Sequence, residues 1–189
     1  MNDTKYVTQP MIGDVITCLA SNNTYTIGPK IDEGGFSIVY HCKDVWENDL
    51  AVKVLKPIGT YEKVKFNAQN EFDKLLQLRN PYITFVYDAF EYKNTFYIVT
   101  ERCEYPLSNL FQMKGFNGML WLMSIARILL QAVYYLHINN YAHQDIHPGN
   151  IFTEVSRFYF SRHFPVTVYP VEILNLCQGK RSLCQRRIK

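Results

Sequence analysis

Residues 25–101 alternate between short runs of β-branched and aromatic residues and short groups of turn residues. Runs of this length are typical of strands, and Gly, Asn and Asp between them favour tight turns. The pattern predicts an antiparallel sheet. Its five expected strands are Tyr25–Ile31, Ser37–Cys42, Leu50–Leu55, Ile83–Glu91 and Thr95–Glu101.

A helical period replaces this alternation in other segments. Between the third and fourth expected strands, Ala68, Phe72, Leu75 and Leu76 follow the spacing of one helix face, which predicts a helix over Lys63–Leu78. After the strands we expect a short helix at Leu107–Lys114 and a longer one. The apolar side of the longer helix is formed by Trp121, Ile125, Ile128, Leu129, Ala132, Val133 and Leu136. A sheet with one helix, followed by a helical portion, predicts an α+β fold with two lobes.

The segment Gly118–Ile138 is the most apolar stretch of the chain. It contains Ser124, Arg127, Gln131 and His137, which a membrane-spanning helix would have to accommodate in lipid. We therefore expect a buried amphipathic helix here and no association with a membrane.

Composition narrows the class of protein. With 189 residues, 48% of them hydrophobic and 15% aromatic, the chain has the profile of one folded domain or two small lobes, and a disordered chain is excluded. The five cysteines form no C-x-x-C pair and their number is odd. No charged and then apolar leader follows Met1. These features predict reduced thiols in a cytoplasmic protein.

Charge changes sign along the chain. Residues 1–150 contain 13 Lys and Arg against 15 Asp and Glu, whereas residues 151–189 contain 7 against 2 and no aspartate. No aromatic platform or amphipathic period accompanies the basic end. It is therefore expected to be a solvated tail, and binding to nucleic acid is not expected.

Two adjacent glycines, Gly34 and Gly35, connect the first two expected strands. Glycine lets backbone N–H groups approach phosphate oxygens without an intervening Cβ atom, so such a turn can cover a nucleotide's phosphates. The alternative is a plain hairpin turn, because the outer glycines of a G-x-G-x-x-G motif are replaced by Asp32 and Ser37.

Lys53 interrupts an otherwise apolar strand. A buried ammonium group is costly unless it is paired, and Glu71 on the following helix is a candidate partner, with phosphate as a second one. The alternative is an exposed lysine on an edge strand.

The densest group of polar residues follows the long helix. Asp145 and Asn150 are five residues apart on an expected loop, where a carboxylate could serve a substrate hydroxyl and a carboxamide could bind a metal ion. His143, Asp145 and His147 also permit a zinc site, but no further His or Cys group stands at a helpful spacing. Pro148 favours a rigid loop instead.

In their order and spacing these motifs resemble the eukaryotic-type protein kinase family, and His147-Pro148-Gly149-Asn150 resembles its serine/threonine branch. The lead-in at residues 13–16 is similar to that of bacterial members. The resemblance covers about Gly13–Phe152. It implies a kinase-like α+β fold with a five-stranded N-lobe, one helix and an incomplete helical C-lobe. The expected divisions are a lead-in at 1–24, the N-lobe at 25–103, a partial C-lobe at 104–153 and a divergent basic tail at 154–189.

The resemblance also implies ATP and Mg²⁺ as cofactors and a Ser/Thr hydroxyl of a protein as acceptor. By the same resemblance Asp145 is the catalytic base, Lys53 and Glu71 order the phosphates, His147 stands where a lysine usually neutralises the γ-phosphate, and Asn150 binds the metal. Thr100 falls at the gatekeeper position and Glu101 opens the hinge. The residues implied to bind the nucleotide are Ile31, Gly34, Gly35, Val39, Ala51, Lys53, Thr100, Glu101, Cys103 and Asn150.

The chain also departs from the family pattern. Gln144 replaces an arginine that pairs with a phosphorylated loop in many kinases. The region of the family's metal-binding Asp-Phe-Gly reads Arg162-His163-Phe164-Pro165, and histidine is a poor substitute for a carboxylate on Mg²⁺. We therefore expect residues from about Glu154 onward to lie outside the family sequence, as after a frameshift, an altered splice or a truncation. The long helix would then keep an exposed apolar face.

Two other functions stay open at this point. The missing metal aspartate favours a catalytically inactive module that binds a nucleotide or a protein partner. The pattern His-x-Asp-x-His-Pro-x-Asn is similar to that of aminoglycoside and related small-molecule phosphotransferases.

Overall fold

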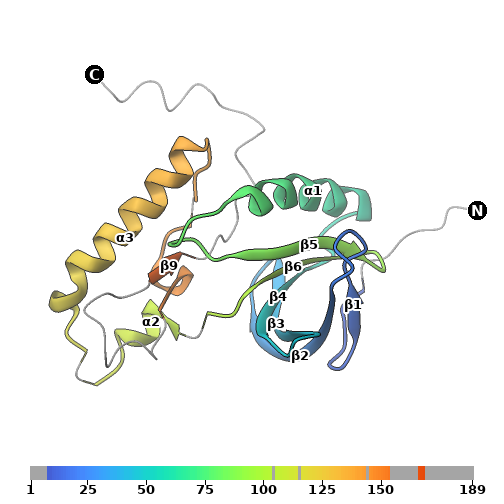
Figure 1. Ribbon diagram of the computed structural model, residues 1–189, viewed down its shortest axis with the longest axis horizontal. Coiled ribbons are helices and arrows are strands. Elements are labelled where there is room, and N and C mark those ends of the chain that lie inside the picture. The colour runs from blue at the N-terminus through green and yellow to red at the C-terminus, as the bar shows by residue number, and fades with distance from the viewer. Residues whose placement is uncertain (1–7, 104, 115, 144, 154–165, 169–189) are drawn as a thin grey trace, which may run out of the picture.

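The computed structural model describes residues 8–103, 105–114, 116–143, 145–153 and 166–168, without the side chains at positions 70, 71, 153 and 166–168. Its main element is an antiparallel sheet with the strand order β1-β2-β3-β4-β6-β5 (Figure 1). The strands are β1 (Val15–Thr17), β2 (Thr24–Glu33), β3 (Ser37–Asp44), β4 (Asp49–Leu55), β5 (Val86–Tyr92) and β6 (Thr95–Glu101).

The antiparallel sheet confirms the expectation from the alternating pattern, but the expected number of five strands is wrong. The sixth strand, β1, pairs with β2 through three residues, from Val15 opposite Thr26 to Thr17 opposite Thr24. Three residues are too short for an alternating pattern to stand out. The fourth expected strand also begins later than predicted, because β5 starts at Val86.

Helix α1 (Tyr61–Gln77) covers one face of this sheet (Figure 1). It begins after Thr60, whose side-chain oxygen accepts a hydrogen bond from the Lys63 N–H at 3.4 Å. The predicted apolar stripe is confirmed, because Ala68, Phe72 and Leu75 are buried against strand residues in one cluster. The helix is therefore held by packing on the sheet rather than by its cap alone.

The opposite face of the sheet encloses a second apolar cluster, because the sheet is rolled. Phe90 of edge strand β5 stacks on Tyr25 of β2 with ring centroids 6.2 Å apart, although these strands are not neighbours in the sheet. Asp88 of β5 joins the same two regions. One of its carboxylate oxygens accepts hydrogen bonds from the Ser21 hydroxyl (3.0 Å), the Asn23 amide (2.9 Å) and the Tyr25 hydroxyl.

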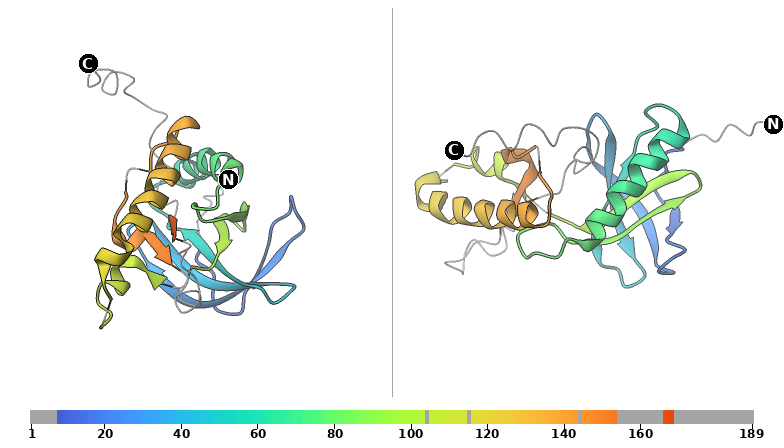
Figure 2. Two further views of the ribbon diagram at one scale, coloured as in Figure 1. Left: turned by 60° about the vertical axis from the view of Figure 1, so that its left-hand side comes forward. Right: turned by 90° about the horizontal axis from the view of Figure 1, so that it is seen from above.

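The described helical portion lies to one side of the sheet (Figures 1 and 2). It contains α2 (Leu107–Leu110), α3 (Gly118–Ile138) and the 3₁₀ turn η1 (Pro148–Asn150). The short helix is four residues long, so the predicted extent Leu107–Lys114 is wrong. Ile128 of α3, Leu107, Leu110 and Ile151 form a small apolar cluster here.

A second sheet of three short strands, β7 (Tyr105–Pro106), β8 (Ile151–Thr153) and β9 (Val166–Val168), lies in the same portion. Strand β9 falls within the segment predicted to diverge from the fold. It nevertheless pairs with β8, with Ile151 opposite Val168. The expectation that residues from about Glu154 onward lie outside the family sequence stays a prediction, because strand pairing does not test it.

Only a narrow stripe of α3 is buried. Ala132 and Leu136 join the cluster under α1, and Ile128 packs on α2, so the prediction of a buried helix holds for one side only. The predicted exposed apolar face is present. It consists of Met119, Leu120, Leu122, Met123, Leu130, Tyr134 and Ile138.

By length and composition α3 is long and apolar enough to cross a membrane. One such helix is weak evidence of a membrane span, because core helices of soluble proteins pass the same test. The expectation of no membrane association therefore stays a prediction.

We predict that Asp88→Ala lowers the free energy of unfolding by about 2 kcal/mol, because it leaves the buried Tyr25 hydroxyl and its neighbours without their acceptor. Ser21→Ala removes one donor and leaves Asp88 satisfied, so we expect a loss below about 1 kcal/mol. Urea unfolding measures both. Equal losses of unfolding free energy in the two variants would contradict the role of Asp88 in joining β5 to the β1–β2 region.

Candidate functional site

The register of the sheet brings several predicted site residues together on one face. Val39 lies opposite Lys53, and Ala51 lies opposite Thr100 on the other side of the same strand. Side chains alternate between faces along a strand, so Lys53 shares its face with Leu55, which packs under α1. Val39, Ala51, Lys53 and Thr100 therefore form one patch on the α1 side of the sheet.

Lys53 is the charged residue of this patch. Its strand β4 lies between β3 and β6, and the residue is only 6% exposed. The alternative of an exposed lysine on an edge strand is therefore wrong. A buried ammonium group requires an anionic or hydrogen-bonding partner. The predicted partner, Glu71, belongs to α1, but its side chain lies outside the described residues, so this pair stays a prediction.

The segment after β6 carries the predicted hinge. The Thr100 side chain is buried, and the Glu101 carboxylate accepts a hydrogen bond from the Phe85 N–H at 2.7 Å. Cys103 is half-buried, and its Sγ atom lies 3.8 Å from the Thr84 hydroxyl. The side chains of Glu101 and Cys103 thus fix the end of the sheet. A role for the hinge backbone in holding adenine stays a prediction.

The glycine turn between β2 and β3 is exposed and lies open. Neither Gly34 nor Gly35 has a positive φ, whereas the two-residue hairpin turns that require glycine do. A Cβ atom added at Gly34 would come no closer than 3.9 Å to a neighbour, and one at Gly35 would meet nothing within 4 Å. Neither backbone conformation nor packing against the protein explains these glycines, which disfavours the plain hairpin.

Ile31 precedes this turn and is 51% exposed, so the described residues do not enclose it. The pairing of β2 with β3 is irregular on both sides of Lys30. An irregular ladder bends a strand and increases its twist. The turn therefore projects from a bent strand, with Ile31 at its base.

The loop after α3 holds Asp145 and Asn150 in direct contact. The Asn150 side-chain amide donates to both the backbone carbonyl and a carboxylate oxygen of Asp145, each at 2.9 Å. Asn150 is 9% exposed and closes the 3₁₀ turn η1, in which its own N–H donates to the His147 carbonyl. Because the amide hydrogens are used on Asp145, the Asn150 side-chain oxygen faces away from that carboxylate and is suited to a hard cation such as Mg²⁺.

The two histidines of the loop differ in environment. His143 is buried, and its Nδ1 atom accepts the Asp145 N–H at 3.3 Å. His147 is exposed, with Nε2 at 3.6 Å from the Asp145 carboxylate. No group of three His, Cys, Asp or Glu side chains suited to a metal ion forms within the described residues. Sequence reasoning missed that His143 holds the Asp145 backbone.

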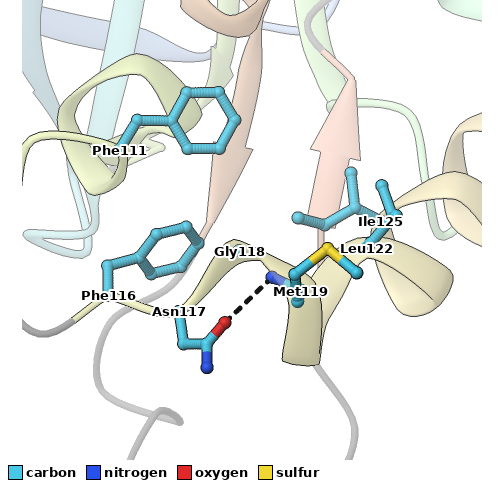
Figure 3. A pocket seen from close by; sticks show the side chains of 7 residues that line it. All are labelled: Phe111, Phe116, Asn117, Gly118, Met119, Leu122 and Ile125. Atoms are coloured by element: carbon cyan, nitrogen blue, oxygen red, sulfur yellow. Dashed lines mark hydrogen bonds between the residues drawn. The ribbon is translucent and has the colours of Figure 1, made fainter.

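An apolar pocket opens at the beginning of α3, and none of these loop residues lines it (Figure 3). Its polar contact is a helix cap, in which the Asn117 side-chain oxygen accepts from the Met119 N–H at 3.1 Å. The remaining lining is mainly apolar, including Phe111, Phe116 and Leu122. None of the predicted site residues lies in it. Gln144 and Arg162-His163-Phe164-Pro165, which depart from the family pattern, lie outside the described residues.

Comparison with known proteins identifies the class. Residues 25–159 match the protein kinase domain family, and the chain belongs to that family. The chain is 30% identical over 135 residues to serine/threonine-protein kinase fused of Drosophila melanogaster, and 31% identical over 128 residues to serine/threonine-protein kinase 36 of Pongo abelii. It is 30% identical over 125 residues to cyclin-dependent kinase-like 4 of Homo sapiens.

These alignments cover 68%, 67% and 65% of this chain. They cover 16%, 10% and 33% of the respective relatives, so the chain spans a third or less of each. The family match ends at residue 159, beyond the boundary near Glu154 that the sequence analysis predicted.

Substitutions in the glycine turn can distinguish an effect on stability from an effect on ligand binding. We predict that Gly35→Ala leaves the free energy of unfolding unchanged or raises it by about 0.5 kcal/mol, because the position tolerates a Cβ atom and alanine restricts the unfolded chain. ATP affinity should fall several-fold, because the added methyl group obstructs close approach of phosphate.

Gly28→Ala is the matched control. Its Cβ atom would lie 2.8 Å from Nδ1 of His41 and 3.1 Å from the His41 carbonyl oxygen, so we expect a clear loss of stability. Thermal unfolding and a nucleotide titration measure both variants. A large loss of stability in Gly35→Ala would contradict a turn kept open for a ligand.

Proposed function

We propose that this chain binds ATP with Mg²⁺ and transfers the γ-phosphoryl group to serine or threonine hydroxyls of proteins. The observation that carries the proposal is the buried ammonium group of Lys53 in a patch with Val39, Ala51 and Thr100. A lysine at the centre of an apolar strand has little structural value, whereas it can neutralise phosphate oxygens. The family match and the names of the serine/threonine kinase relatives agree with this chemistry.

The patch has two chemically distinct parts that fit a nucleotide. Val39 and Ala51 present small apolar side chains, which suit the face of an adenine ring. Lys53 supplies the charge for the α- and β-phosphates. Position 71 is three residues after Ala68 and four before Leu75, which are both buried, and this helical spacing supports the pairing of Glu71 with Lys53. The exposed turn at Gly34 and Gly35 supplies the Gly35 N–H for a phosphate oxygen, since the Gly34 N–H already donates to the Ser37 carbonyl at 2.9 Å.

The loop after α3 supplies the groups for transfer. Asp145 accepts the proton of the acceptor hydroxyl as its oxygen attacks the γ-phosphorus and ADP leaves. Asn150 holds the Asp145 carboxylate in place at 2.9 Å and offers its side-chain oxygen to the metal. When bound, Mg²⁺ neutralises charge on the phosphate oxygens. His147, 3.6 Å from Asp145, is a weaker electrostatic aid than the family's usual lysine.

One observation favours a second candidate function. The sequence from residue 151 to 189 contains no aspartate, whereas the family binds its metals with an aspartate in this region as well as an asparagine. The alternative is a module that binds a nucleotide without transferring phosphate. Such a module would need Lys53 but not Asp145.

The test compares ligand-induced stabilisation with phosphate transfer. We predict that ATP with Mg²⁺ stabilises the wild-type chain by about 2.7 kcal/mol at a concentration one hundred times the Kd, and that Lys53→Met abolishes this gain. Asp145→Asn should keep the gain but lower phosphate transfer to a protein substrate by about 10²-fold or more. Thermal melts and a radiolabel transfer assay measure the two effects.

Lys43→Met is the charge control, because Lys43 is an exposed lysine on β3 that pairs with Glu47 at 2.8 Å. It should leave both measurements unchanged. Stabilisation without transfer in the wild-type chain would favour the binding module. No stabilisation by ATP would contradict both candidates.

A further inference from the structure

Lys56 makes a set of contacts with the glycine turn that the proposed function does not use. It follows β4 directly, and its ammonium group donates to the Gly34 carbonyl at 2.7 Å and to the Glu33 carboxylate at 2.6 Å. Lys30 donates to the other oxygen of the same carboxylate at 3.1 Å. The hydrogen bonds from Lys56 and then Lys30 lower the pKa of Glu33 below its usual value.

Backbone hydrogen bonds fix the same turn on both sides of these contacts. The Lys56 N–H donates to the Phe36 carbonyl at 2.8 Å, and the Gly34 N–H donates to the Ser37 carbonyl at 2.9 Å. The carbonyl groups of Gly34, Phe36 and Ser37 are therefore all engaged within the protein. The side chain of Lys56 is 21% exposed, so its ammonium group is partly screened from water.

The contact between Lys56 and the Gly34 carbonyl also fixes the direction of the Gly35 N–H, because both groups belong to one planar peptide unit. No cis peptide occurs among the described residues, and in a trans peptide the carbonyl and the following N–H point in opposite directions. Because the Gly34 carbonyl points at Lys56, the Gly35 N–H points away from it. No residue that the structure describes accepts a hydrogen bond from this N–H.

We propose that Lys56 is a positioning residue, which holds the Gly34 carbonyl so that the Gly35 N–H is presented to a phosphate oxygen of a bound nucleotide. The inference rests on the proposed function and adds a residue to it. A preoriented donor binds an anion without the cost of ordering the turn at the moment of binding. Lys56 acts through the turn, because its ammonium group is already engaged by Glu33 and Gly34.

The test uses Lys56→Met, with Lys56→Arg as the conservative variant and Lys43→Met as the control. Lys43 is a second surface lysine in an ion pair with a glutamate, but it lies at the far end of β3 from the turn. Three quantities are measured for each chain: the Kd of ATP with Mg²⁺, the Kd of adenosine, and the exchange rate of the Gly34 amide without ligand. Adenosine has the base and ribose but no phosphate.

We expect Lys56→Met to raise the Kd of ATP about tenfold, the equivalent of one lost hydrogen bond to a charged group, and to leave the Kd of adenosine unchanged. The Gly34 amide hydrogen should exchange faster with solvent, because Lys56 no longer stabilises the turn that contains the hydrogen bond from the Gly34 N–H to the Ser37 carbonyl. Lys56→Arg should restore most of both effects, since guanidinium can donate to a carbonyl and a carboxylate together. Lys43→Met should change none of the three quantities.

Other results would overturn the inference. A weaker ATP complex with unchanged Gly34 exchange would mean that Lys56 contacts phosphate directly. Equal weakening of ATP and adenosine would mean a general structural role, and no change in ATP affinity would exclude any role in binding. Failure of the wild-type chain to bind either ligand would contradict the proposed function itself, together with the phosphate role of Lys56. That result differs from an effect confined to the Lys56 variants.

Discussion

The structure around the nucleotide-facing patch depends on the buried positive charge of Lys53, which requires a compensating anion. Strand β4 is flanked by β3 and β6, and Lys53 is only 6% exposed, so the ammonium group has lost most of its water. Removing an ion from water costs several kcal/mol unless a partner offsets it. A fold that keeps such a group must provide it with anions, either from the neighbouring helix or from a ligand. The patch of Val39, Ala51 and Thr100 around it is mainly apolar, and Val39 lies on the strand that follows the open glycine turn.

The rest of the sheet makes this arrangement stable. One face is closed by α1 and the other by rolling, which brings Phe90 of one edge strand against Tyr25. Asp88 holds the two sides of the rolled sheet together by accepting three hydrogen bonds from residues of the β1–β2 region. Burial, together with the hydrogen bond to Asp88, raises the pKa of Tyr25. A sheet closed in this way holds β2 and β4 at a fixed separation. Lys56 can therefore reach the glycine turn from the end of β4.

Much of this architecture could be predicted from sequence, for physical reasons. Each long strand buries one side, and so does α1. The spacing of the apolar residues along each element therefore shows which side is buried. The three-residue strands β1 and β9 are too short to show a period. The exposure of α3 depends on what packs against it, which a helical pattern alone cannot tell. Asp145 and Asn150 stood out as a pair. The contacts of His143 with the Asp145 N–H and of Lys56 with the Gly34 carbonyl involve backbone groups, which residue type does not reveal.

Covalent labelling by an acyl-phosphate derivative of ATP tests whether Lys53 lies beside the phosphates of a bound nucleotide. The reagent transfers its acyl group to a lysine that lies beside the bound phosphates, and mass spectrometry locates the modified residue. We expect acylation of Lys53, although it is among the least exposed lysines described, and protection of Lys53 by excess ATP. Labelling distributed over exposed lysines such as Lys43 and Lys63, with no protection by ATP, would contradict it.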